Sequence, residues 1–263
     1  MILVDHIFML LLFVVQPIHG AFAYRQYLRK IAAGEPADRI RLFRETLLLE
    51  WVAFAVLAVT WVYFGRSFAD FGFVWPGGRN FWIGAILLIP VCGFLVYSWR
   101  KCRTMDADDK ARQRESFGNL VHFLPHSNSE YRTFFGLSIT AGIVEETIYR
   151  GFVFWYLSHF MPLWGVIAVS SLGFGLGHSY QGAGGIVRVT LIGAVVGAIY
   201  VYTGSIWLPI IAHALLDILQ GAAILEILRD QGACADKSRS SSGSSNSTRP
   251  RLRTMSERSH YCD

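Results

Sequence analysis

The chain has 263 residues, of which 53% are hydrophobic and 16% charged, and its mean hydropathy is +0.38. This apolar content exceeds what one soluble core normally uses and argues against an ordinary soluble domain. The formal net charge of +5 does not indicate a nucleic-acid partner, because the basic residues lie between apolar segments. The composition predicts an integral membrane protein surrounded by lipid.

Long apolar stretches recur along the chain, and a hydrocarbon layer of about 30 Å needs about 20 such residues per helix. We expect spans at residues 6–24, 46–65, 81–99, 133–157, 161–180, 186–203 and 206–228. The predicted fold class is all-α, a polytopic transmembrane bundle of about seven spans, within six to eight, with an intramembrane catalytic cavity. The first stretch ends near a cleavage-like Ala21-Phe22-Ala23, but it has no basic leading region, so we expect it to be retained.

Lys and Arg alternate between the connections. They are frequent after the first and third predicted spans, sparse after the second and absent after the fourth. Because basic connections stay in the cytoplasm, this pattern predicts an outside N-terminus and a cytoplasmic C-terminus. The membrane would be the plasma membrane in a bacterium or the endoplasmic reticulum in a eukaryote.

The chain divides into three parts by sequence character. Residues 1–130 hold N-terminal transmembrane helices and a cytoplasmic connecting loop, residues 131–230 form the predicted catalytic helical core, and residues 231–263 form a Ser- and Arg-rich tail expected to be disordered. In the first part, Glu50 stands near the cytoplasmic end of the second span. We expect it to snorkel or to pair with a nearby Arg, without a catalytic role.

Ionisable residues gather in the second part. A charged side chain at membrane depth costs about 2.5 to 3.5 kcal/mol on insertion scales, so those retained usually face a cavity or one another. They occur in three segments, GIVEETIYRGF, LGFGLGHSYQG and IAHALLD, which contain Glu145, Glu146 and Arg150, then His178, then His213 and Asp217.

Helical spacing predicts how these side chains are arranged. Glu146 and Arg150 are four residues apart and can form a structural ion pair that supports the site. Glu145 points away from that pair and could act as a general base on water. His213 and Asp217 also share one helix face, and the Asp could orient the imidazole.

Peptide hydrolysis needs an activated water and a donor for the oxyanion, and these residues could supply both. We predict that Glu145 and His178 activate the water, while His213 and Asp217 stabilise the oxyanion. The same four side chains could instead hold a divalent metal such as Zn²⁺, because imidazole and carboxylate are its normal ligands.

The three segments resemble the motifs of the CPBP family, which includes the type II CAAX prenyl proteases and bacteriocin-processing, Abi-like enzymes. The family pattern is E-E-x-x-x-R, then F-x-x-x-H, then H-x-x-x-N or D. The matching residues, in the same order, are Glu145, Glu146 and Arg150, then Phe174 and His178, then His213 and Asp217. The likeness covers about residues 133–228.

The resemblance implies an intramembrane endopeptidase, glutamate-dependent or metal-dependent, that cleaves a membrane-associated or lipid-modified protein or peptide. Type II prenyl proteases usually carry Asn where this chain has Asp217. Since an ionised Asp cannot donate to an oxyanion, Asp217 would have to be protonated, bind a metal or orient His213.

Two other functions fit the same spans. A non-proteolytic bacteriocin-immunity or membrane scaffold protein would keep the helices without the chemistry. A transporter would also place charges at membrane depth, but the sequence has no visible inverted repeat or paired broken helices.

Overall fold

The computed structural model describes residues 2–229, and every regular element within this range is helical. Residues 2–228 form one compact unit. The all-α fold class is therefore confirmed for the described part of the chain. The tail predicted over residues 231–263 falls outside it.

The first helical run widens locally before a proline. Helix α1 (Leu3–Leu10) continues through a π-helical turn, η1 (Leu11–Val15), into α2 (Gln16–Ala32). Pro17 accounts for the turn, because it lacks an N–H and its ring crowds the carbonyl four residues earlier. The run continues without interruption through the cleavage-like residues 21–23.

Helices α3 (Arg39–Tyr63) and α4 (Gly78–Arg103) follow, joined through the short 3-10 helix η2 (Phe68–Phe71). The connection after α4 contains α5 (Ala107–Ser116) and η3 (Gly118–His122). Helix α5 is polar on all sides and buries no residue. The apolar residues that follow it, among them Phe117 and Leu124, pack against Ile227 and Leu228 at the end of the bundle.

The second half begins at a capping box. The hydroxyl of Ser127 accepts from the backbone N–H of Glu130, whose carboxylate accepts from the N–H of Ser127, and this reciprocal pair starts α6. The elements in order are α6 (Asn128–Glu146), η4 (Thr147–Val153), α7 (Phe154–Leu157), α8 (Leu163–Gly177), η5 (Ser179–Gln181), α9 (Gly182–Thr203) and α10 (Trp207–Leu228).

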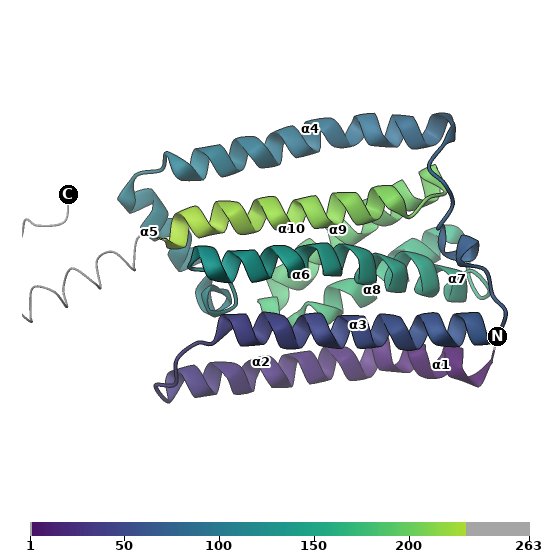
Figure 1. The fold of residues 1–263 in the computed structure, drawn as a ribbon, viewed down its shortest axis with the longest axis horizontal. Helices are drawn as coiled ribbons and strands as arrows, with labels where there is room; N and C mark the ends of the chain where they lie inside the picture. Colours follow the sequence, from purple (N-terminus) through teal and green to yellow (C-terminus); the bar gives the residue numbers. More distant parts are fainter. Residues whose placement is uncertain (1, 230–263) are drawn as a thin grey trace, which may run out of the picture. The chain divides into compact units, whose positions relative to one another are not determined.

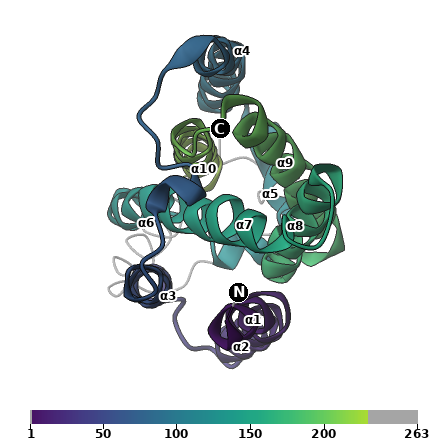
Figure 2. The same ribbon diagram turned by 90° about the vertical axis from the view of Figure 1, so that its right-hand side faces the viewer.

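Figure 1 shows the long helices running side by side, and Figure 2 looks along them. Helix α6 packs against both α10 and α3, α8 packs against α9, and α4 covers the outer side of α10. The α1–α2 run lies against α8. Thus α3, α6, α8 and α10, which are far apart in the sequence, surround a common interior.

All seven predicted spans correspond to helical segments. Within residues 2–229, five helical runs are long and apolar enough to cross a membrane: Leu3–Ala32, Arg39–Tyr63, Gly78–Arg103, Ser179–Thr203 and Trp207–Leu228. Helix α8 is a shorter apolar helix. The run from α6 to α7 is not in that set, and it contains Glu145, Glu146 and Arg150. The chain is a multi-pass membrane protein, and which end faces the cytoplasm stays a prediction.

A buried apolar cluster surrounds η4. It contains Leu57 and Trp61 of α3, Phe71 of η2, Val144 of α6, Ile148, Tyr149, Phe152 and Val153 of η4, Phe154 and Leu157 of α7, and Val166 and Phe174 of α8. This packing holds η4 between α3 and α8. Glu145 and Glu146 at the end of α6, and Arg150 within η4, are therefore held by a buried part of the bundle.

Candidate active site

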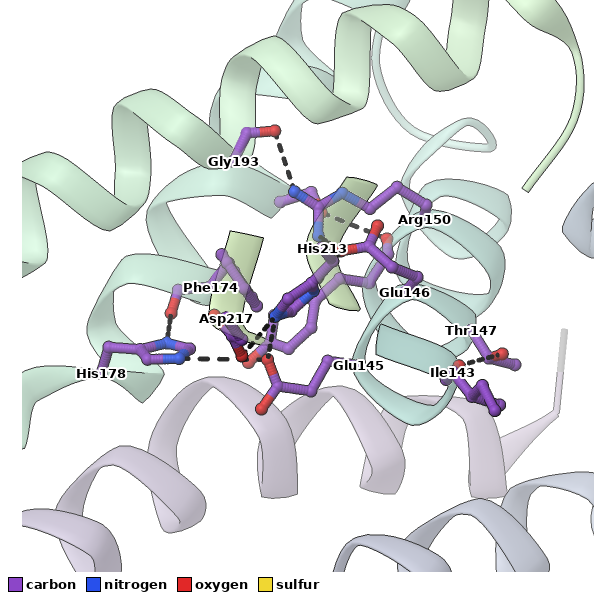
Figure 3. Close-up of polar contacts among 12 residues, drawn as sticks. Ile143, Glu145, Glu146, Thr147, Arg150, Phe174, His178, Gly193, His213 and Asp217 are labelled. Atoms are coloured by element: carbon purple, nitrogen blue, oxygen red, sulfur yellow. Dashed lines mark hydrogen bonds and ion pairs between the residues drawn. The ribbon is translucent and has the colours of Figure 1, made fainter. Parts of the chain in front are cut away.

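The structure brings together the four side chains predicted for catalysis (Figure 3). Glu145 lies on the last turn of α6, His178 directly follows α8, and His213 and Asp217 lie on α10. The Oε2 atom of Glu145 is 3.9 Å from Nε2 of His178 and 3.8 Å from Nε2 of His213. Nε2 of His213 is 3.6 Å from Oδ2 of Asp217. These atoms face one another from three helical elements.

The spacing leaves these groups without direct hydrogen bonds to one another, since such bonds are normally about 2.7 to 3.2 Å long. Oε2 of Glu145 is buried and has no hydrogen-bond partner among the described residues. The Asp217 side chain keeps 32% of its surface exposed and the Glu145 side chain 22%. The cluster is therefore reachable from outside the protein.

Beside the cluster lies the expected ion pair. Nη1 of Arg150 donates to Oε1 of Glu146 at 2.8 Å, and Nη2 donates to the carbonyl of Gly193 at 2.9 Å. The guanidinium also stacks 4.8 Å above the ring of Phe174. Glu146 and Arg150 are each only 1% exposed, so their charges are compensated within the protein.

Both imidazoles are held through Nδ1. Nδ1 of His178 lies 2.9 Å from the carbonyl oxygen of Phe174, which can only accept, so this nitrogen carries the proton. Nδ1 of His213 lies 2.8 Å from Oε1 of Glu146. Sequence reasoning assigned Glu146 only to Arg150 and missed this second contact, because helical spacing says nothing of neighbours on another helix. Each Nε2 is left facing Glu145.

A close helix crossing places Glu145 and Glu146 beside α10. A Cβ atom on Gly142 would lie 2.9 Å from the carbonyl oxygen of Ile210 and 3.0 Å from the Cβ of Ala214. Only glycine fits at this contact without displacing a helix. After Glu146 the chain continues as the π-helical segment η4. Widened helical turns of this kind often occur at functional sites.

Glu50 is not where the sequence suggested. Its Oε2 atom is buried without a hydrogen-bond partner among the described residues. It interacts electrostatically with Glu145, His213 and Asp217, and no Lys or Arg is among these neighbours. The expectation of a snorkelling or Arg-paired residue is corrected, because α3 packs on α6 and turns Glu50 inward. The sequence did contain a signal for this inward position, because an ionisable residue within an apolar span usually faces a cavity or another polar group.

The donor chemistry of the cluster suits zinc, but its arrangement does not form a metal site. Among residues 2–229, no group of three or more His, Cys, Asp or Glu side chains is placed to hold a metal ion. The zinc hypothesis for Glu145, His178, His213 and Asp217 therefore stays a prediction.

The fold and this cluster define a class, namely polytopic helical membrane proteins with a Glu-His centre between their helices. Residues 127–219 match the family model described as type II CAAX prenyl endopeptidase Rce1-like. The chain therefore contains a domain of the CAAX protease family, and the resemblance seen in the three motifs is confirmed. The match supports an intramembrane endopeptidase. No curated protein and no solved structure matched the chain.

Proposed function

We propose that this protein hydrolyses a peptide bond of a membrane-associated or lipid-modified protein or peptide, using Glu145 as the general base. The observation that carries this proposal is the position of Glu145 Oε2, 3.9 Å and 3.8 Å from the Nε2 atoms of two histidines on separate elements. A water placed among these atoms can hydrogen bond to more than one of them.

His178 would hold that water. Because its Nδ1 donates to the carbonyl of Phe174, the neutral ring presents an unprotonated Nε2 towards Glu145. The water donates one proton to this nitrogen as a hydrogen bond and gives the other to Glu145. The resulting hydroxide equivalent attacks the carbonyl carbon and forms a tetrahedral intermediate. Glu145 then returns the proton to the leaving amine as the C–N bond breaks.

His213 would stabilise the oxyanion. Oε1 of Glu146 accepts from Arg150 and lies 2.8 Å from Nδ1 of His213; where this Nδ1 donates to it, Nε2 can donate as well only in the imidazolium form. Asp217, 3.6 Å from that Nε2, supplies a counter-charge and orients the ring. A protonated Asp217 would add a second donor to the oxyanion.

The test uses the full chain in proteoliposomes with a panel of membrane-tethered peptides. Loss of a general base typically costs about 10² to 10⁴ in rate, so Glu145→Gln should lower kcat by that factor. Glu45→Gln, at an exposed position on α3, is the control and should cleave like the unaltered protein. Equal cleavage by Glu145→Gln and the unaltered protein would overturn the assignment.

Metal content tests the zinc hypothesis separately. If zinc is a resident cofactor, the purified protein should hold about one zinc per chain, and His178→Ala and His213→Ala should lose it. Full cleavage by zinc-free protein would eliminate the zinc-dependent mechanism.

A further inference from the structure

The N-terminal run α1–α2 lies outside the residues matched by the family model, and the mechanism above does not use it. It nevertheless contacts α8 and η5, the two elements that flank His178. The ring of Phe13 lies beside Gly173 of α8, where a Cβ atom would collide with it. One turn further on, Gln16 lies against Gly177, the residue before His178. The run therefore follows α8 up to the candidate active site.

Of the four predicted catalytic residues, His178 alone lies outside the helices. It is the cap residue of α8, with φ −97° and ψ 21°, whereas the other three lie within α6 and α10. The last carbonyls of an α-helix have no partner within the helix. Contacts from other elements are therefore needed to fix the backbone that carries this imidazole.

The α1–α2 run contacts the backbone on both sides of His178. Nε2 of Gln16 donates to the carbonyl of Gly177 at 3.4 Å, and Oγ of Ser179 donates to the carbonyl of Pro17 at 3.4 Å. A Cβ atom on Gly177 would lie only 3.1 Å from Oε1 of Gln16, so the amide lies directly against this backbone. A polar side chain in an apolar membrane helix often hydrogen bonds to a neighbouring helix in this way.

The run is itself fixed at both ends, so it can act as a support. At one end, Arg66 forms two hydrogen bonds of 2.7 and 2.9 Å with Asp5, which is only 1% exposed. At the other end, Tyr24 and Tyr27 donate to backbone carbonyls of η3. Gln16 lies between these two attachments and is held against α8 by them.

We propose that Gln16 is a positioning residue that fixes the backbone carrying His178, so that the N-terminal run completes the candidate active site. This inference rests on the proposed function, in which one water contacts both Nε2 of His178 and Oε2 of Glu145. These two atoms are 3.9 Å apart. A shift of the imidazole by about 1 Å would disturb that arrangement and can cost about 10²-fold in rate.

Hydrogen–deuterium exchange in detergent tests the support without requiring cleavage. Gln16→Met keeps the length of the side chain but removes the donor. The backbone amides from His178 to Gln181 should then exchange about fivefold faster, the factor that corresponds to one hydrogen bond of average strength. Ser179→Ala, on the other side of His178, should act in the same direction. Gln26→Met, at an exposed position of α2, is the matched control and should exchange like the unaltered protein.

Cleavage of a membrane-tethered peptide in proteoliposomes tests the role in catalysis. Gln16→Met should lower kcat by about ten- to a hundredfold and leave KM nearly unchanged, because the imidazole is displaced while the substrate contacts remain. Its unfolding curve should match that of Gln26→Met. A side chain with only a structural role would alter the unfolding curve without this separation of kcat from KM.

The outcomes separate this inference from the proposed function. Unchanged exchange in Gln16→Met, a kcat equal to that of Gln26→Met, or a loss confined to KM would each overturn the role of Gln16. Such results, with cleavage still dependent on Glu145, leave the proposed function intact. Absence of any Glu145-dependent cleavage refutes the proposed function and, with it, the positioning of His178 for that reaction.

Discussion

In each imidazole of the site, one nitrogen hydrogen bonds to a neighbouring group of the protein and the other faces Glu145. Nδ1 of His178 hydrogen bonds to the carbonyl of Phe174, and Nδ1 of His213 hydrogen bonds to the carboxylate of Glu146. These contacts fix the ring orientations before a substrate arrives, which is how neighbouring groups tune catalytic histidines. The orientations of the His178 and His213 rings therefore depend on Phe174 and Glu146.

The side chain of Arg150 should be critical for the stability of the protein. Replacing it with methionine would leave Glu146 buried with only His213 as a charge partner, and breaking a buried pair typically costs about 3 to 5 kcal/mol. We expect Arg150→Met to lower the free energy of unfolding by about that amount, measured by denaturant titration in detergent.

The matched control is Arg41→Met, which removes an ion pair with the same four-residue spacing. The Arg41 and Glu45 side chains are 75% and 56% exposed, so water screens their interaction. This variant should unfold like the unaltered protein. An Arg150→Met protein with the same unfolding curve as Arg41→Met would show that the buried pair contributes nothing.

Among the elements, two features set the site geometry. Gly142 permits the contact between α6 and α10, and η4 presents Arg150 to α9 within a buried apolar cluster. The carbonyl of Tyr149 within η4 accepts from the backbone N–H of Phe154, and the hydroxyl of Ser170 on α8 donates to the same oxygen at 3.2 Å. Helix α8 thus supplies a second partner to this carbonyl, and the contact joins α8 to η4.

We expect Gly142→Ala to reduce activity more than stability. The added methyl would press on the backbone of Ile210 and move α10, with His213, away from Glu145. Displacement of a catalytic group by about 1 Å can cost about 10²-fold in rate, and overpacking costs about 1 to 3 kcal/mol. The measurement is kcat for a membrane-tethered peptide beside an unfolding curve.

Gly136→Ala on the same helix is the control, because nothing lies within 4 Å of its Cβ position. Alanine favours a helix interior over glycine by about 1 kcal/mol, so this variant should be active and no less stable. If the two variants had equal activity, the contact at Gly142 would not set the site geometry.

For the whole molecule, the basic connections predict the orientation in the membrane. The basic connections that follow α2 and α4 lie at the same end of the bundle, since Tyr24 and Tyr27 of α2 donate to the backbone of Asn119 and His122. The alternation of Lys and Arg in the sequence therefore corresponds to two ends of the structure. By the positive-inside rule, we expect this basic end to be cytoplasmic.

Cysteine labelling in intact cells tests this orientation. In a cysteine-free background, an impermeant maleimide should label Arg79→Cys, at the opposite end, and leave Glu35→Cys unlabelled until the membrane is opened. Both positions are exposed in the structure, so access depends on the membrane alone. Labelling of Glu35→Cys in intact cells would invert the topology.

The sequence by itself determined the all-α membrane fold, the positions of the seven helical segments and the family. It could do so because these depend on local signals: long apolar stretches, helical spacing and three short motifs. The contact between Glu146 and Arg150 was predictable for the same reason, since it lies within one helical turn.

Only the tertiary structure decided how the helices meet. The contact of His213 with Glu146, the π-helical turn after α6 and the inward position of Glu50 depend on how one helix packs against another. Spacing along a chain specifies a helix face but not the partner of that face. From the sequence, Glu50 is expected to snorkel or to pair with an Arg, whereas the packing of α3 against α6 buries its Oε2 atom.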